Sequence, residues 1–366
     1  MQNLRFSTGF SKNFGGDKVK FYVCREKSGP KPFKVAIIGA GPAGLTAAGY
    51  LACRGYEVHV YDKMPEGGGM VAFAIPEVRI PIKTVREGVK DLERLGVNFH
   101  FRTKVVYDSP RELGDEWAEH FVSLERLLAE FDALLIATGA WRPRKLKVPG
   151  VDLPGVYDAL KLLHHIKMAR IGYYPWEKVP DLKGRHVVII GAGYTAVDVA
   201  IESRLLGAEK VTMVYRRSLE QSYAKVEIRK LIEEGLEFIE MATPVRIIGE
   251  SRAEGVEFAR TRIVEGTVVT TDERFIVDAD IVAYAIGQLP TSPIREVVCA
   301  NEKILKEAGI FFAGDVVAPR NIGTAMREGR ARAKEIEEWL TKKAPKKVFP
   351  VPVTTRLIGS VLSGKC

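Results

Sequence analysis

Two glycine-rich loops are the residues of this 366-residue chain whose types and spacing most directly suggest chemistry. The first reads GAGPAG over residues 39–44, and the second reads GAGYTA over residues 191–196. Each follows a short apolar run and precedes a segment with a helical pattern, which is the usual setting of a dinucleotide-binding loop. Backbone N–H groups at the N-terminus of such a helix bind a pyrophosphate. The sequence therefore predicts two nucleotide-binding sites.

The glycines of the first loop have separate predicted roles. Gly39 permits a tight turn, Gly41 lets the backbone approach the pyrophosphate, and Gly44 allows the helix to pack closely on the strand. Pro42 suits the first position of the helix, where an N–H group has no partner. Asp62 ends the next strand, eighteen residues past Gly44, where its carboxylate can accept hydrogen bonds from both ribose hydroxyls. The alternative, glycines that only make a turn, does not account for this full context.

The second loop differs at the position that decides ribose recognition. Ala196 replaces the third glycine, which is a tolerated variant. The following strand ends in VYRR rather than VYDK, so that Arg216 and Arg217 stand where the first copy has Asp62 and its neighbouring lysine. Paired guanidinium groups bind a 2′-phosphate through forked, charge-assisted hydrogen bonds, whereas a carboxylate repels it. We predict a ribose without a 2′-phosphate at the first site and NADP(H) rather than NAD(H) at the second. The alternative is that the arginines only cover the end of a strand.

The two loops lie in copies of one larger unit. Residues 35–63 and 187–217 align at an offset of 152, and each reads as strand, glycine turn, helix and β-branched strand. A second pair of apolar strands, at 132–140 and 280–288, ends each time in a glycine turn. The predicted fold class is therefore α/β, with two Rossmann-like dinucleotide-binding domains.

Two nucleotide sites of opposite ribose chemistry indicate FAD held permanently and a nicotinamide that exchanges. Near the end of the folded body, an apolar strand ends in Gly314 and Asp315, and a new helix follows. The Asp315 carboxylate can bond a ribitol hydroxyl, and the helix N-terminus can stabilise negative charge on a reduced flavin ring. The residues predicted at that helix start are Gly323, Thr324 and Ala325. Taken alone, the Gly-Asp pair would indicate an ordinary turn.

The order of the motifs resembles that of the small (beta) subunit of glutamate synthase. GAGPAG, EGGGM, AIPEVRIP, ATGA, the second loop with VYRR, and AGDVV follow one another over about residues 33–340. Related flavin modules occur in dihydropyrimidine dehydrogenase and in bifurcating NADPH–ferredoxin oxidoreductases. The resemblance implies a glutathione- or thioredoxin-reductase-like architecture, with an FAD domain at 33–146 and 286–340 and an NAD(P)H domain inserted at 147–285.

The resemblance also implies cofactor contacts. It places Gly68, Gly69 and Met70 by the ribitol and flavin, Ile75, Pro76 and Arg79 beside the isoalloxazine, Val105 at the adenine, and Thr138 and Gly139 where the two domains cross. The remaining predicted cofactor-binding residues are Ala43, Lys63 and Ala137 in the first domain, and Gly191, Gly193, Tyr194 and Thr195 beside the two arginines in the second.

Hydride transfer from NADPH to flavin requires no nucleophile or general base from the protein. The sequence shows no triad and no carboxylate pair, so we predict no catalytic residue and no metal site. The chain would position the cofactors, exclude water and stabilise the reduced flavin. Because reduced FAD can release electrons singly, the protein would convert a two-electron donor into a one-electron supply.

The electron acceptor is where the sequence departs from the family. Residues 1–34 hold only Cys24 in place of a cysteine-rich iron–sulfur domain, so we expect electrons to pass to an iron–sulfur or acidic partner protein or to a larger subunit. One alternative is a stand-alone ferredoxin–NADP reductase. A thioredoxin-reductase-like flavoprotein is disfavoured by the lack of a CxxC pair. A nucleotide-binding structural subunit is disfavoured by the two arginines.

The ends of the chain carry its positive charge. The formal net charge is +9, of which residues 1–34 and 341–366 carry +6 each, leaving −3 between them. These ends either are solvated or dock an acidic partner, whereas nucleic-acid binding would need a basic folded face. We treat residues 1–32 as a basic extension and 341–366 as a basic tail, and we predict an interaction arm at 348–366. Self-association and assembly with another subunit are both compatible with the sequence.

Cysteine use and hydropathy bear on the location of the protein. The four cysteines are scattered, which argues against a disulfide scaffold or a zinc ribbon and makes a reducing, cytoplasmic setting the default expectation. Residues 35–53 run without a charge for nineteen residues, long enough to span a bilayer. The glycine loop inside this run favours a strand and a helix instead, so we predict no membrane span.

Overall fold

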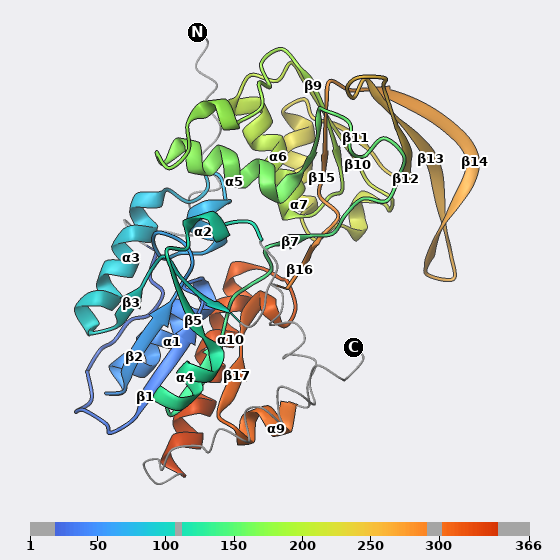
Figure 1. Ribbon diagram of the computed structural model, residues 1–366. Helices are drawn as coiled ribbons and strands as arrows, with labels where there is room; N and C mark the ends of the chain where they lie inside the picture. Colours follow the sequence, from blue (N-terminus) through green and yellow to red (C-terminus); the bar gives the residue numbers. More distant parts are fainter. Residues whose placement is uncertain (1–18, 107–111, 291–301, 343–366) are drawn as a thin grey trace. The chain divides into compact units, whose positions relative to one another are not determined.

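The computed structural model describes residues 19–106, 112–290 and 302–342 (Figure 1). The predicted interaction arm at 348–366 lies outside the described residues, and so does most of the basic tail. The described part of the extension, from Val19 onward, belongs to the same compact unit as the first glycine loop.

The chain divides into two compact units. Unit 1 comprises Met1–Phe73, Val78–Arg142 and Gln288–Cys366, and unit 2 comprises Ala74–Glu77 and Pro143–Gly287. These divisions lie close to the predicted domain boundaries at 146 and 286. The four residues 74–77 are a difference, because the predicted scheme assigned them to the FAD domain and the structure groups them with unit 2.

Unit 1 is built on a five-stranded parallel sheet with the order β17-β6-β1-β2-β3. Its strands are β1 (Lys34–Ile38), β2 (Glu57–Tyr61), β3 (Asn98–His100), β6 (Ala133–Ile136) and β17 (Ile310–Phe312). The central strands β1 and β6 are continuous apolar runs and are almost completely buried. This pattern is typical of parallel strands that are covered on both faces. A small parallel pair, β4 (Thr103–Val106) and β5 (His120–Ser123), also belongs to this unit.

Six α-helices of unit 1 lie in the described part of the chain. They are α1 (Pro42–Cys53), α2 (Met70–Phe73), α3 (Ile82–Leu95), α4 (Leu124–Glu130), α9 (Glu302–Glu307) and α10 (Ile322–Thr341). Helix α1 is buried almost all round, and α10 packs against it. At their crossing, a Cβ atom on Gly329 of α10 would lie 2.1 Å from the carbonyl oxygen of Ala43. Only glycine allows the two helices to approach so closely.

Unit 2 repeats the same sheet, with the order β11-β10-β9-β15-β8 and all neighbours parallel. Its strands are β8 (Val156–Asp158), β9 (His186–Ile190), β10 (Lys210–Val214), β11 (Glu237–Ile239) and β15 (Ile281–Tyr284). Strand β9 has the place of β1, β10 that of β2, and β15 that of β6. The predicted α/β class with two Rossmann-like domains is thereby confirmed.

Helices α5 (Ala159–Arg170), α6 (Tyr194–Leu205) and α7 (Lys225–Glu233) belong to unit 2, together with an antiparallel sheet. The strands of that sheet are β12 (Ala242–Ile248), β13 (Gly255–Val264) and β14 (Thr267–Asp278). The short strands β7 (Arg142–Pro143) and β16 (Gln288–Leu289) pair with each other where the chain passes from one unit to the other. No helix in the described part of the chain is both long and apolar enough to cross a membrane.

A disulfide joins Cys24 to Cys53, the last residue of α1, across 29 positions of sequence. The structure differs here from the expectation of reduced cysteines. The residues before β1 fold back over α1 and bring the two cysteines together. No local motif in the sequence predicts this contact.

Candidate cofactor-binding sites

The first glycine loop lies at the carboxyl edge of the unit 1 sheet. Ile38 and Tyr61 are register partners at the ends of β1 and β2, so Gly39 and Asp62 follow side by side. Gly39 has a φ of +106°, and a Cβ atom there would lie 2.4 Å from the carbonyl oxygen of Ala137. Glycine is therefore required at this turn, as the sequence predicted.

Two other predicted flavin segments pack on the start of α1. A Cβ atom on Gly69 would lie 2.9 Å from the Cα of Gly41, and one on Gly314 would lie 2.9 Å from the Cβ of Ala43. A Cβ atom on Gly41 itself would meet no atom within 4 Å. The fold thus brings the EGGGM and Gly-Asp segments against the first loop and leaves space in front of the Gly41 backbone, where a pyrophosphate is expected.

A cavity opens beside this loop. Its empty volume is about 480 Å³, part of which is open solvent. Its lining combines predicted residues with residues that the sequence did not single out, and consists of Ile38, Gly39, Tyr61, Asp62, Lys63, Thr103, Lys104, Val105, Thr138 and Trp141. The Thr138 hydroxyl is buried and has no hydrogen-bond partner in the described part of the chain. Buried polar atoms are normally paired, so this orphaned hydroxyl fits a site in which a bound nucleotide supplies the partner.

The Asp62 carboxylate is held in place by the backbone. One oxygen accepts a hydrogen bond from the Ala40 N–H at 2.6 Å, and the other accepts one from the Met64 N–H at 2.8 Å. Burial raises the pKa of Asp62, and these two hydrogen bonds act against that rise. Each carboxylate oxygen keeps a second lone pair. Asp62 can therefore still accept a hydrogen bond from each of two ribose hydroxyls, in a fixed orientation.

The predicted Lys63 is engaged within the protein. Its ammonium donates to the carbonyl of Leu113 at 2.6 Å and to the carboxylate of Asp115 at 2.8 Å. Lys104 also pairs with Asp115. Burial opposes ionisation of Asp115, but the two ammonium groups overcome it and hold the pKa of that carboxyl below its usual value. The cluster of two lysines and one aspartate leaves one net positive charge beside the cavity, and Lys104 and Asp115 were not predicted.

The Gly-Asp segment places Asp315 at the start of a helical turn before α10. Its carboxylate accepts a hydrogen bond from the Arg320 N–H at 3.1 Å. Burial raises the pKa of Asp315 to about 6, and the nearby Glu328 carboxylate adds to this rise. Asp315 therefore changes charge close to neutral pH.

The N-terminus of α10 differs from its prediction. The Asn321 side chain caps the helix by accepting from the Thr324 N–H at 2.8 Å, and the Asn321 carbonyl accepts from the Ala325 N–H at 3.0 Å. Of the three N–H groups predicted to face the flavin, these two already have partners. Among the described residues, the N–H of Gly323 has none, because it lies in the first turn.

The second glycine loop has the same geometry in unit 2. Ile190 and Val214 are register partners at the ends of β9 and β10. Gly191 has a φ of +126°, and a Cβ atom there would lie 2.3 Å from the carbonyl oxygen of Ala285. A Cβ atom on Gly193, directly before α6, would meet no atom within 4 Å. Tyr194 is exposed at the first position of α6.

The two arginines follow β10, at the same edge of the sheet as this loop. The strand register corrects the sequence alignment by one residue, because Tyr215 stands at the counterpart of Asp62 and the arginines at the counterparts of the two residues after it. Their backbone is fixed, because the Thr261 hydroxyl donates to the Arg216 carbonyl at 3.0 Å and the Met241 N–H donates to the Arg217 carbonyl at 3.3 Å. Among the described residues, neither guanidinium makes a hydrogen bond or an ion pair. Two unpaired guanidinium groups on a fixed strand end fit a phosphate ligand.

Family models identify the chain. Residues 33–329 match the family described as pyridine nucleotide-disulphide oxidoreductase. The chain belongs to this family. This membership confirms the sequence-based prediction of an FAD-dependent NAD(P)H oxidoreductase.

Several curated proteins are similar to this chain over most of its length. The glutamate synthase [NADPH] small chain of Halomonas elongata is 34% identical, with 84% of this chain and 68% of that protein covered. The corresponding small chain of Escherichia coli is 30% identical, with the same coverage. The putative oxidoreductase AegA of E. coli is 31% identical, and this chain spans only 50% of its length.

Solved structures share the fold. Mycobacterium tuberculosis FprA in complex with NADPH superimposes with a TM-score of 0.71 at 20% identity, covering 91% of each chain. Lactococcus lactis thioredoxin reductase superimposes with a TM-score of 0.59 at 23% identity, covering 85% of this chain and all of that one. At these identities the likeness shows the fold alone.

The segment that the family resemblance places beside the isoalloxazine is divided between the units. Ile75 and Pro76 belong to unit 2, whereas Arg79 belongs to unit 1. Within unit 2, the Glu77 carboxylate pairs with the ammonium of Lys167 on α5, a side chain that is only 1% exposed. Burial lowers the pKa of Lys167, and the Glu77 carboxylate acts against this. Sequence reasoning missed Lys167, because nothing in the local pattern of α5 marks it.

Proposed function

We propose that the chain transfers hydride from NADPH to FAD and passes the electrons to a separate iron–sulfur or other acceptor protein. The observation that carries this proposal is the contrast between two equivalent strand ends. One ends in the backbone-held carboxylate Asp62, and the other in the unpaired Arg216 and Arg217. A protein that bound one nucleotide twice would have no use for opposite charges at the ends of equivalent strands.

The residues of unit 1 fit FAD. Gly39 and Gly41 let the backbone approach the pyrophosphate, Asp62 accepts the ribose hydroxyls, and the Thr138 hydroxyl gains a partner. Asp315 binds the ribitol through its carboxylate, and the Gly323 N–H contributes a partial positive charge at the flavin. When bound, FAD supplies a ring that accepts a hydride and can release electrons one at a time.

The residues of unit 2 fit NADPH. Gly191 and Gly193 open the loop to the pyrophosphate, and the two arginines bind the 2′-phosphate. Tyr194 and Thr195 lie at the start of α6, in the first turn beside the same phosphates. These contacts fix the position of the nicotinamide relative to unit 2.

The Glu77–Lys167 pair fastens residues 74–77 to α5 within unit 2. A second pair, Arg170 with Glu202 at 2.7 Å, lies nearby on α5 and α6. Glu202 is 2% exposed, and breaking either pair would leave a charge with little access to water. Through Glu77, the nicotinamide unit therefore holds Ile75 and Pro76 firmly.

The proposal of a separate acceptor protein rests on the charge of this chain and on the names of its relatives. Curated relatives are named small chains or subunits, and this chain carries +6 in each of its two end segments. Electrostatic steering would favour an acidic partner. We place the protein in the cytoplasm, where NADPH-dependent reduction of such a partner would take place.

The thioredoxin-reductase alternative gains no support from the described disulfide. Cys53 ends α1 and Pro42 begins it, so the disulfide lies roughly 18 Å along the helix axis from the glycine loop. The disulfide therefore lies at the opposite end of α1 from the loop at which the pyrophosphate is expected.

Anaerobic reduction tests the proposed function. The purified chain, reconstituted with FAD, is expected to be yellow and to bleach on addition of NADPH, and to do so far more slowly with NADH at the same concentration. Subsequent addition of a one-electron acceptor dye should restore the colour. Failure to retain FAD, or retention without bleaching by either nucleotide, would contradict the proposal.

A further inference from the structure

The residues before β1 form a strap across the helices of unit 1. We define the strap as residues 19–33. At its start, the Val19 N–H donates to the Thr84 carbonyl at 3.0 Å. Near its end, the Ser28 N–H donates to the Cys53 carbonyl at 2.8 Å, and the Lys31 N–H donates to the Gly55 carbonyl at 2.8 Å. The strap therefore contacts α3 and the end of α1.

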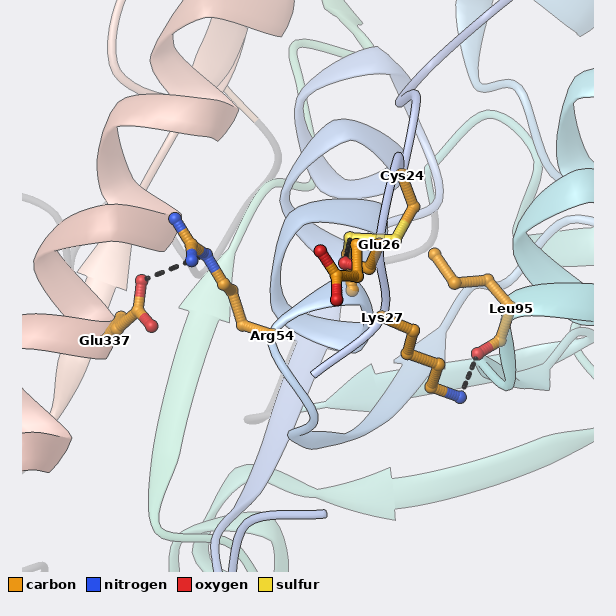
Figure 2. The surroundings of a disulfide bond; sticks show 7 residues. Cys24, Glu26, Lys27, Arg54, Leu95 and Glu337 are labelled. Carbon is orange, nitrogen blue, oxygen red and sulfur yellow. Dashed lines mark hydrogen bonds and ion pairs between the residues drawn. A yellow bond between two sulfur atoms is a disulfide. The ribbon is translucent and has the colours of Figure 1, made fainter. Parts of the chain in front are cut away.

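One covalent bond fastens the middle of the strap to α1. Figure 2 shows the disulfide between Cys24 and Cys53 beside Glu26 and Lys27. Cys53 is 6% exposed, whereas Cys24 is partly exposed and stands between the exposed Val23 and an exposed arginine. An external thiol therefore reaches the disulfide from the Cys24 side.

We propose that the Cys24–Cys53 disulfide is a thiol-exchange site that an external dithiol reduces, and that its reduction weakens FAD binding. A thiolate of the dithiol attacks Cys24 Sγ, the bond between the two cysteines breaks, and Cys53 leaves as a thiolate and takes up a proton. The second thiol of the dithiol then displaces Cys24, which is also protonated. The protein disulfide gains two electrons, and the dithiol is oxidised to a disulfide.

The surroundings of the disulfide suit this exchange. Arg25, Lys27 and Arg54 outnumber the nearby carboxylates Glu26 and Glu337, so the local field favours an incoming thiolate and a leaving thiolate. Lys27 and Arg54 are further held by the Leu95 carbonyl and by Glu337, as Figure 2 shows. Cys53 Sγ lies 3.3 Å from the Glu26 carbonyl, which can accept a hydrogen bond from the Cys53 thiol after reduction.

The strap is linked to both helices that would carry FAD. The Glu337 carboxylate of α10 accepts from the Tyr50 hydroxyl of α1 at 2.7 Å and from the Lys31 ammonium of the strap at 3.1 Å. Tyr22 of the strap covers α1, since a Cβ atom on Gly49 would lie 2.4 Å from the Tyr22 Cβ. The strap thus clamps the far parts of α1 and α10, whose starts form the proposed FAD site. This part of the inference rests on the proposed function.

Thiol trapping tests the exchange site. Full-length protein is alkylated under denaturing conditions, either directly or after the folded protein has been treated with dithiothreitol, and the Cys24 and Cys53 peptides are analysed by mass spectrometry. Both cysteines are expected to be blocked in untreated protein and alkylated after treatment. Alkylation in untreated protein, or continued blocking after treatment, would overturn the proposal.

The dissociation constant of FAD tests the consequence. Reduced wild-type protein is expected to bind FAD about tenfold more weakly than oxidised protein. This is the loss expected if only about one reduced molecule in ten keeps the strap in place and can bind FAD. Cys24→Ser should show the weaker binding in either redox state, whereas the control Cys366→Ser should keep the wild-type response. An equal FAD affinity of oxidised and reduced wild-type protein would overturn the link to the cofactor. No FAD binding in any state would instead contradict the proposed function, and thiol trapping would still decide the exchange site.

Discussion

The two units of this protein have the same strand–loop–helix geometry at the carboxyl edge of their sheets, but the side chains at that edge carry opposite charges. In unit 1, Asp62 is fixed by two backbone N–H groups and lines a cavity that is partly open to solvent. In unit 2, the two arginines stand on a fixed backbone, but their guanidinium groups have no partner among the described residues. A preorganised acceptor in a cavity suits a ligand that stays, and unpaired cations at an open strand end suit a ligand that comes and goes.

Removing the two arginines should have the largest effect, because it removes the difference in charge between the two nucleotide sites. The double variant Arg216→Ala/Arg217→Ala is expected to raise KM for NADPH by about a hundredfold, since hydrogen bonds to charged groups contribute about 1.5–3 kcal/mol each. KM for NADH should hardly change. Steady-state kinetics with both nucleotides measures the effect. Arg262→Ala, at an exposed arginine of the same unit, is the control, and an equal loss with NADPH and NADH would refute the assignment.

The contact between α5 and residues 74–77 should affect the reaction rate but not nucleotide binding. Lys167→Met is expected to slow flavin reduction at saturating NADPH by roughly tenfold to a hundredfold, because small misplacements of reacting groups have effects of this size. The dissociation constant of NADPH should stay as in wild type. Stopped-flow absorbance separates the two quantities. Lys161→Met, at an exposed position of the same helix, should leave both unchanged, and an unaltered rate in Lys167→Met would exclude the positioning role.

Substitutions of the open glycines should separate the two sites. Gly41→Ala adds a Cβ atom where no protein atom lies within 4 Å, so the free energy of unfolding of the apoprotein should not fall. FAD affinity should fall roughly tenfold or more, because overpacking against the ligand costs about 1–3 kcal/mol. Gly193→Ala should do the same for NADPH and leave FAD binding intact. Calorimetric titration of each variant with each nucleotide measures this, and a loss of both affinities in one variant would contradict two separate sites.

The smallest effect concerns pH. The pKa of Asp315 is raised to about 6, so the folded apoprotein holds a proton that the unfolded chain has released between about pH 4 and pH 6. The contribution of Asp315 to stability is therefore greatest at low pH and falls as the pH rises through this window. FAD binding, which uses the carboxylate as an acceptor, should strengthen by a few fold over the same window. In Asp315→Asn, the FAD affinity should depend less on pH. If the FAD affinity of the variant has the same pH dependence as that of wild type, Asp315 is excluded from the site.

The sequence alone determined the parts of this protein that depend on local periodicity and turn chemistry. The strand–loop–helix pattern located Gly39 and Gly191, whose positive φ angles and close backbone contacts only glycine tolerates. The repeat aligned Asp62 with the arginines, and this alignment was wrong by one residue, because the strand register puts Tyr215 at the counterpart of Asp62 and the arginines directly after it. The loops and the strand ends beside them were predictable because each is decided within about thirty residues of chain.

Only the tertiary structure decided the contacts between distant segments. It joined Cys24 to Cys53, brought Lys104 and Asp115 to the first cavity, and paired Glu77 with Lys167 across 90 positions of sequence. It also assigned the α10 cap to Asn321, which uses an N–H group that had been predicted for the flavin. No periodic pattern marks such pairs, because their geometry depends on how the helices pack on the sheet rather than on the residues beside them in the chain.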